Sequence, residues 1–293
     1  MVGLNSSSVL PYAWLFKRLW LGTLGGALLL FGLSYNIYTY ALFCCIMCFG
    51  AQREFYRLFP HTASPRDKLG GIVIGLLLFF YTFCARLEYI SWEWGIVFLL
   101  LPFLGLLKNL YRPQKESPFE NLSVIFFGIL YIAVPCAILN FWTLSPEGDH
   151  NPIPLLGSCI IIWGQDSGAF IVGRLVGRHP LFFRHSPRKT WEGLLAGVFF
   201  SFVAGFLLRY TTGSTIWWCM APLLSVTSVY GDLIASMLKR HFEVKDTGHS
   251  LSSHGGFLDR FDSFLFSVPF VALFYKIYER YEDVFDPFLS LLP

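Results

Sequence analysis

The sequence is poor in charged residues, and this scarcity limits the kind of protein that it can encode. Asp, Glu, Lys and Arg make up 14% of its 293 residues, whereas hydrophobic residues make up 55%. Soluble domains carry about 25% charged residues, so the composition excludes an ordinary soluble domain. The net charge of +3 is too small to indicate a nucleic-acid partner.

Several familiar site motifs are also missing. The sequence has no Gly-Lys-Ser/Thr phosphate loop, no His-Glu-x-x-His zinc site and no Gly-x-Ser-x-Gly nucleophile turn. Its seven cysteines lie within apolar runs and lack metal-ligand spacing with a partner His. We therefore interpret them as small apolar residues in the membrane rather than as disulfides or zinc ligands.

The apolar residues come in long runs rather than in the spaced stripes of amphipathic helices. A run of about 18 or more apolar residues is typical of a helix that spans a bilayer. Lys17 and Arg18 precede the first run, as in a signal peptide, but many further runs follow, so we interpret it as a retained helix. The sequence predicts nine spans, at 14–33, 35–51, 69–86, 90–107, 120–142, 153–173, 191–209, 215–235 and 258–278.

Lys and Arg are distributed unevenly between the loops that join these spans. Cytoplasmic loops of membrane proteins carry an excess of both residues. If the N-terminus is cytoplasmic, 18 of the 22 fall on the cytoplasmic side. The other four are Arg86, Arg209, Lys276 and Arg280. We therefore expect an all-α polytopic membrane protein with about nine helices, a cytoplasmic N-terminus and a C-terminus on the opposite side.

Polar content divides the chain into two parts. Residues 1–150 carry few polar groups within their spans and are predicted to form N-terminal transmembrane helices. Residues 151–293 hold nearly all the ionisable residues that lie in or beside spans. Ionisable groups at membrane depth are costly and usually mark function. We therefore expect this second part to be a C-terminal catalytic transmembrane region with cytoplasmic loops.

The richest polar stretch runs from Ser236 to Ser263. Asp259 and Asp262 are three residues apart at a predicted helix start, so they share a face. Asp232 and Ser236, four apart near the end of the preceding span, also share one. Converging carboxylates suit Mg²⁺, which binds one or two carboxylates together with substrate phosphates.

Cations and glycines accompany these carboxylates and would suit an anionic ligand. The cations are Lys239, Arg240, Lys245 and Arg260. His254, Gly255 and Gly256 lead into the last span, and glycines before a helix N-terminus let backbone N–H groups approach an anion. The plain structural interpretation is a solvated loop with a capping Asp at each end. Four carboxylates, four cations and two glycines together argue against it.

Asp166 is a carboxylate inside the sixth predicted span and needs a partner or a wet cavity. A structural polar contact between helices would explain it equally well. Gly173 and Gly177 follow as a small-xxx-small pair, which favours helix packing over phosphate binding.

Arg188 and Lys189 lie at the cytoplasmic entry to the seventh predicted span, after Pro187, which we expect in a turn. The positive-inside rule and attraction to anionic lipid explain both cations without catalysis. A role in binding an anionic substrate is the competing hypothesis.

The stretch from Ser236 to Asp262 resembles the signature of the phosphatidate cytidylyltransferases, also called CDP-diacylglycerol synthases. That signature is Ser-x-x-Lys-Arg, four residues, Lys-Asp, and then His-Gly-Gly-x-x-Asp-Arg-x-Asp. Here it reads Ser236, Lys239-Arg240, Lys245-Asp246, His254-Gly255-Gly256, Asp259-Arg260 and Asp262. The segment around Asp166 and residues 186–193 also resemble blocks of this family. The resemblance covers about residues 160–265.

The resemblance implies transfer of CMP from CTP to phosphatidic acid, giving CDP-diacylglycerol and pyrophosphate, with Mg²⁺ as cofactor and a second cation left open. On its strength, the expected metal ligands are Asp232, Asp259, Asp262 and, as a further candidate, Asp246. The expected phosphate-binding residues are Lys239, Arg240, Lys245 and Arg260, with Arg188 and Lys189 guiding the lipid headgroup. Ser236, His254, Gly255, Gly256 and Asp166 would complete the site.

The resemblance also implies partners and a location. CTP and phosphatidic acid would be the substrates, the lipid bilayer the surroundings, and a homodimer is left open. We expect a multi-pass protein of the inner (plasma) membrane whose active site faces the cytoplasm.

Two other classes of function compete with this hypothesis. A transporter would need polar groups at the midplane of several helices, and many transporters are built from two related halves. Here the polar groups cluster at one predicted mouth and no repeat is visible. A CTP-dependent lipid kinase stays open, while the Asp-Gly-x-x-Ala-Arg block of CDP-alcohol phosphotransferases is absent from the sequence.

Overall fold

The computed structural model describes residues 25–111, 118–182, 186–248 and 256–281. Nearly all of this is helical, which confirms the predicted fold class. The elements are the helix Gly25–Ser34, α2 (Ile37–Arg57), α3 (Pro65–Arg86), η1 (Trp92–Gly95), α4 (Ile96–Leu110), α5 (Pro118–Gly128), the π-helical turn η2 (Ile129–Ala133), α6 (Val134–Thr143), α7 (Ile153–Val176), β1 (Pro180–Phe182), β2 (Ser186–Thr190), α8 (Trp191–Thr212), α9 (Trp217–His241) and α10 (Leu258–Arg280).

Seven helices in the described ranges are long and apolar enough to cross a membrane, and they coincide with the last seven predicted spans. The first predicted span lies partly outside those ranges, where the helix Gly25–Ser34 is only 10 residues long. The second corresponds to α2, which does not meet the same criteria. The chain is therefore a multi-span membrane protein, while the count of nine stays a prediction.

One local prediction was wrong. Pro187 was expected in a turn, but it lies within β2, which pairs antiparallel with β1 in a small hairpin. Pro cannot donate to a strand ladder, but an edge strand of a two-stranded hairpin tolerates it. The hairpin leads directly into α8. Its last residue, Thr190, is the N-cap of that helix, and its side chain accepts a hydrogen bond from Gly193 N.

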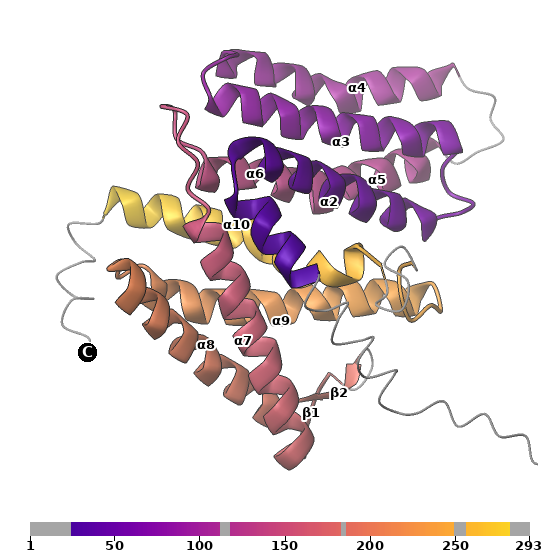
Figure 1. The fold of residues 1–293 in the computed structure, drawn as a ribbon. Helices are drawn as coiled ribbons and strands as arrows, with labels where there is room; N and C mark the ends of the chain where they lie inside the picture. Colours follow the sequence, from indigo (N-terminus) through magenta and orange to yellow (C-terminus); the bar gives the residue numbers. More distant parts are fainter. Residues whose placement is uncertain (1–24, 112–117, 183–185, 249–255, 282–293) are drawn as a thin grey trace, which may run out of the picture.

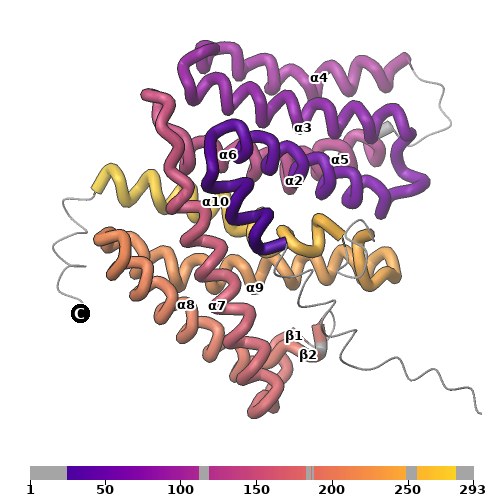
Figure 2. Tube along the Cα trace, in the orientation of Figure 1, coloured from indigo at the N-terminus to yellow at the C-terminus, as the bar shows by residue number. Residues whose placement is uncertain are grey.

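The helices form two groups with α10 between them (Figures 1 and 2). Helices α2 to α6 lie on one side, and α7, α8 and α9 on the other. Helix α10 packs against α9 in one group and against α6 and α2 in the other. The start of α10 is therefore placed where both parts of the chain meet.

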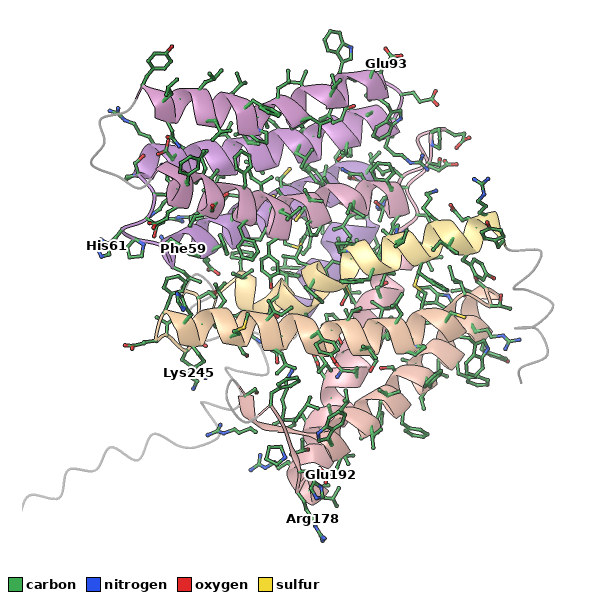
Figure 3. All side chains as sticks on the ribbon, turned by 180° about the vertical axis from the view of Figure 1, so that it is seen from behind. Phe59, His61, Glu93, Arg178, Glu192 and Lys245 are labelled. Carbon is green, nitrogen blue, oxygen red and sulfur yellow. The ribbon has the colours of Figure 1, made fainter. Side chains whose placement is uncertain are left out.

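The ends of the helices alternate between two ends of the bundle. The connections from α2 to α3 and from α9 to α10 lie at one end, to the right in Figure 1. Those from α6 to α7 and from α8 to α9 lie at the other. From behind, His61 and Lys245 lie at one end and Glu93 at the opposite end (Figure 3). This arrangement matches the predicted alternation, while the side that faces the cytoplasm stays a prediction.

The span from Phe119 to Thr143 is interrupted by η2 near its middle. Pro135 follows this turn and has no N–H to donate to the carbonyl of Tyr131, four residues earlier. The wider π turn accommodates this missing bond, and such turns are frequent at functional sites.

Glycines let the helices of the second group approach closely. Cβ atoms added at Gly193 and Gly197 would lie 2.9 Å and 3.0 Å from carbonyl oxygens of α7. A Cβ at Gly173 would lie 3.5 Å from Gly193 Cα, so this glycine packs against α8, as the sequence suggested. A Cβ at Gly231 on α9 would lie 2.9 Å from Ser263 Cα on α10.

The close approach at Gly231 generates a stability prediction. We expect Gly231→Ala to lower the melting temperature in detergent, because α9 and α10 must separate and overpacking costs about 1–3 kcal/mol. The matched control is Gly70→Ala in α3, where an added Cβ meets nothing within 4 Å. It gains only helix propensity, so its melting temperature should stay the same or rise. Equal changes in the melting temperature of the two variants would contradict the packing role of Gly231.

Candidate active site

Helices α9 and α10 bring the predicted carboxylates together at one end of the bundle. Asp232, Ser236 and Lys239 follow one another on α9 at helical spacing. Asp259 and Asp262 lie in the first turns of α10, three residues apart on one face. Because this side of α9 faces the start of α10, a single cluster forms from both helices.

Lys239 is the cation at the centre of this cluster. Its Nζ lies 2.8 Å from Asp259 Oδ1 and 4.0 Å from Asp262 Oδ2. The three side chains are 13%, 8% and 6% exposed, so the charges are largely removed from water. Buried ions are stable only when they are paired and hydrogen-bonded. One ammonium group therefore holds two carboxylates of the neighbouring helix.

The second oxygen of Asp259 fixes the loop that joins α9 to α10. Oδ2 accepts hydrogen bonds from Thr247 N at 2.9 Å, Thr247 Oγ1 at 3.0 Å and Gly256 N at 3.1 Å. These donors come from both described ends of the loop, and the carboxylate lies in the first turn of α10, where the helix dipole favours negative charge. Both oxygens of Asp259 are thus occupied by donors of the chain.

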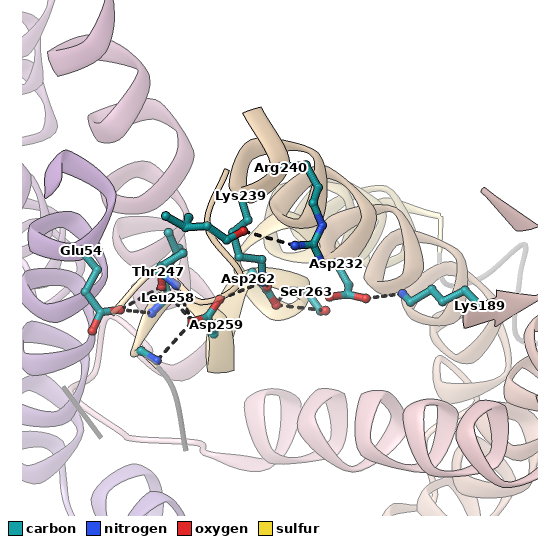
Figure 4. Close-up of polar contacts among 12 residues, drawn as sticks. Glu54, Lys189, Asp232, Lys239, Arg240, Thr247, Leu258, Asp259, Asp262 and Ser263 are labelled. Carbon is teal, nitrogen blue, oxygen red and sulfur yellow. Dashed lines mark hydrogen bonds and ion pairs between the residues drawn. The ribbon is translucent and has the colours of Figure 1, made fainter. Parts of the chain in front are cut away.

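Asp262 and Asp232 form the other half of the cluster. Asp262 is buried and accepts hydrogen bonds from Ser263 N at 2.7 Å and Ser263 Oγ at 3.3 Å. Asp232 is ion-paired with Lys189 of β2. The two carboxylates are close enough to interact electrostatically. In Figure 4 the charged groups form a row that begins at Glu54 on α2 and ends at Lys189.

The hairpin and α7 contribute to the same region. Lys189 of β2 forms an ion pair with Asp232, so attraction to anionic lipid does not account for all of its contacts. Asp166 on α7 is within electrostatic range of both Lys189 and Asp232. Next to it, the buried Gln165 accepts a hydrogen bond from Ser228 Oγ at 3.2 Å and ties α7 to α9. The three sequence blocks that were singled out separately therefore converge in space.

The remaining predicted residues lie on or beside the elements that form the cluster, or outside the described residues. Ser236 is half-buried on α9, and Arg240 is exposed and donates to Val244 O at 3.4 Å. Gly256 is described and binds Asp259, whereas His254 and Gly255 lie outside the described residues. The exposed ones are Arg188, Lys245, Asp246 and Arg260.

The donors present can be compared with what a divalent cation requires. Among the residues that the structure describes, no three His, Cys, Asp or Glu side chains gather as a metal site. Asp259 is occupied by donors, and Asp246 is exposed in the loop. Asp262 and Asp232 fit better, because they are close, of like charge and only partly neutralised by lysines. Mg²⁺ needs only one or two protein carboxylates when phosphates supply further oxygens, so this pair fits it.

Two residues of the N-terminal part reach the cluster and were not predicted from the sequence. Glu54 on α2 is fully buried and contacts the loop between α9 and α10. Tyr131 in η2 is within electrostatic range of Asp262 and Asp232. Its hydroxyl is buried and has no hydrogen-bond partner in the described parts of the chain.

The sequence held one signal for Glu54 and almost none for Tyr131. Glu54 is an ionisable residue shortly after the second predicted span, which ends at residue 51. The structure continues that helix to Arg57, so Glu54 belongs to the helix and not to a loop. For Tyr131 the only hint was Pro135 inside a span, which announces an irregular turn but not its direction.

Comparison with known proteins gives one consistent result. A family model described as "Cytidylyltransferase family" matches residues 16–278. The chain is 36% identical over 179 residues to the phosphatidate cytidylyltransferase of Bacillus subtilis. It is 35% and 34% identical over 180 residues to those of Staphylococcus haemolyticus and Staphylococcus aureus. These matches cover 60% of this chain and 64–65% of the relatives' length.

Proposed function

Since the chain belongs to the cytidylyltransferase family, we propose that it transfers CMP from CTP to phosphatidic acid, forming CDP-diacylglycerol and pyrophosphate. The relatives named phosphatidate cytidylyltransferase support the choice of substrates. The observation that carries the proposal is the cluster in which Lys239 and Lys189 hold the carboxylates Asp259, Asp262 and Asp232 at one end of the bundle.

The reaction joins two anions. A phosphate oxygen of phosphatidic acid attacks the α-phosphorus of CTP, and a new P–O bond forms. The bond from the α-phosphorus to the oxygen that bridges to the β-phosphorus breaks, and its electron pair leaves with pyrophosphate. Because the lipid phosphate is already ionised near neutral pH, the attack needs no protein base. Catalysis then rests on positioning and on offsetting negative charge.

The cations around the cluster supply that charge. Lys239 and Lys189 are held in place by carboxylates and can share their N–H groups with phosphate oxygens. The exposed cations that can meet the triphosphate or the lipid headgroup are Arg188, Arg240, Lys245 and Arg260.

A divalent cation, Mg²⁺, completes the proposal. Asp262 and Asp232 would hold it, while Asp259 keeps Lys239 and the loop in position. When bound, the ion neutralises charge on the phosphate oxygens and on the departing pyrophosphate. We do not propose Asp246 as a ligand of this ion, because its side chain is exposed in the loop after α9.

The site would face the cytoplasm across the inner membrane. The connection that carries Lys245 lies at the same end of the bundle as His61. The loops at this end carry most of the Lys and Arg residues, which favours the cytoplasmic side. This placement lets a soluble nucleotide meet a lipid headgroup at the membrane surface.

A product assay tests the reaction. Purified protein with CTP, phosphatidic acid and Mg²⁺ should form CDP-diacylglycerol and one pyrophosphate for each lipid converted. Asp262→Asn should lower kcat by about 100-fold or more, in the range found when one preorganised electrostatic group is removed. The control is Asp149→Asn, an exposed carboxylate in the connection before α7, which should keep wild-type activity.

Other outcomes of the assay point elsewhere. Release of CDP together with a phosphorylated lipid alcohol would replace the proposal with a lipid kinase. Full activity of Asp262→Asn would remove this residue from the site, and activity that persists in excess chelator would remove the divalent cation.

Thiol labelling tests the orientation. His61→Cys and Glu93→Cys place exposed thiols at opposite ends of the bundle. In intact spheroplasts an impermeant maleimide should label the Glu93→Cys variant at once and the His61→Cys variant only after permeabilisation. The unsubstituted protein gives the background from its seven cysteines. Labelling of the His61→Cys variant in sealed spheroplasts would reverse the orientation.

A further inference from the structure

Glu54 is a charged residue type in an unusual setting. It lies in the last turn of α2, in the part of the chain that is otherwise poor in polar groups, and it is 0% exposed. Its carboxylate contacts Thr247 in the loop after α9 and Leu258 at the start of α10, about 200 residues further along the chain. Burial of a carboxyl group is costly in free energy unless the group is hydrogen-bonded or paired.

One purpose is to cap α10. Glu54 Oε2 accepts a hydrogen bond of 2.9 Å from Leu258 N, at the first residue of the helix. The N-cap residue Phe257 offers no side-chain cap to α10. The first N–H groups of a helix need acceptors, and a carboxylate also complements the positive end of the helix dipole. Glu54 thus supplies from α2 what the local sequence of α10 does not.

Glu54 is also linked to Asp259 through one hydroxyl group. Thr247 Oγ1 lies 3.3 Å from Glu54 Oε2 and 3.0 Å from Asp259 Oδ2. Asp259 in turn holds Lys239 at 2.8 Å. A chain of contacts therefore leads from α2 to the centre of the cluster, as Figure 4 shows.

The loop fits closely around this carboxylate. A Cβ added at Gly256 would lie 2.2 Å from Glu54 Oε2, and one at Gly248 would lie 2.8 Å from Glu54 Oε1. These glycines stand at the two described ends of the loop. Their lack of side chains lets both ends fold over Glu54, so the carboxylate and the two glycines form one fitted contact.

We propose that Glu54 is a positioning residue of the cytidylyltransferase site, which fixes the start of α10 and with it Asp259 and Asp262. The inference rests on the proposed function for its role in catalysis. Glu54 acts through Leu258 and Thr247 and does not touch the substrates. The N-terminal part of the chain is then a component of the site and not only a membrane anchor.

A substitution series at Glu54 tests the proposal. Glu54→Ala removes the acceptor of Leu258 N and the contact with Thr247 Oγ1. We expect kcat to fall about tenfold to 100-fold with a smaller change in the KM for CTP, because misplacing a site by about 1 Å can cost about 100-fold. Glu54→Gln keeps an oxygen for Leu258 N and Thr247 Oγ1, so it should recover most of the lost kcat. Glu54→Asp, one methylene shorter, should fall between the two.

The matched control is Gln52→Ala, on the same helix. Gln52 is also 0% exposed, but it bonds to Gly71 O on α3, away from the loop. Assays are run well below both melting temperatures. A loss of kcat in Gln52→Ala equal to that in Glu54→Ala would show a general effect of burial and overturn the proposal.

Hydrogen exchange gives a readout that does not need activity. Glu54→Ala should speed exchange at residues 256–262, and Gln52→Ala should not. If the wild type lacks cytidylyl transfer but exchange changes as expected, the proposed function fails while the positioning role of Glu54 at α10 stands. Unchanged exchange together with a kcat within about twofold of wild type would overturn the inference about Glu54 itself.

Discussion

The site depends on one ammonium group shared between two carboxylates. Lys239 on α9 holds Asp259 at 2.8 Å and lies 4.0 Å from Asp262, both on α10 and all three largely buried. Without the lysine, α10 would present two uncompensated carboxylates to the interior, which is strongly unfavourable. The close approach of α9 and α10 at Gly231 brings the helices near enough for this pairing. Packing and electrostatics therefore support each other at the same place.

The surroundings extend this pairing to both parts of the chain. On one side, Asp259 binds the loop, and the loop binds Glu54 of α2. On the other side, Asp232 binds Lys189 of the hairpin, with Asp166 of α7 in electrostatic range. Because α10 lies between the two helix groups, a site at its first turn can draw side chains from both.

Local spacing predicted much of this arrangement. The pairs Asp232/Ser236 and Asp259/Asp262 share helix faces because helices repeat about every 3.6 residues, and long apolar runs located the last seven spans. Spacing could not reveal contacts between distant segments, such as Lys189 with Asp232 or Glu54 with Leu258. Contacts of this kind depend on how the helices pack against one another, and a single sequence carries no information about that packing.

The errors have equally local causes. The second predicted span ends at residue 51, whereas α2 continues to Arg57 and so includes Glu54. Pro187 was expected in a turn and lies in a strand, because a two-stranded hairpin has edges that need no N–H.

The central interaction can be measured by a double-mutant cycle on unfolding in detergent. The variants are Lys239→Met, Asp259→Asn and the double substitution, compared by their free energies of unfolding. Removing one partner of a buried ion pair costs about 3–5 kcal/mol, whereas replacing both costs much less. We therefore predict that the double variant is more stable than Lys239→Met alone. If the losses of unfolding free energy in the two single variants added up to the loss in the double variant, a shared buried charge at the centre of the site would be contradicted.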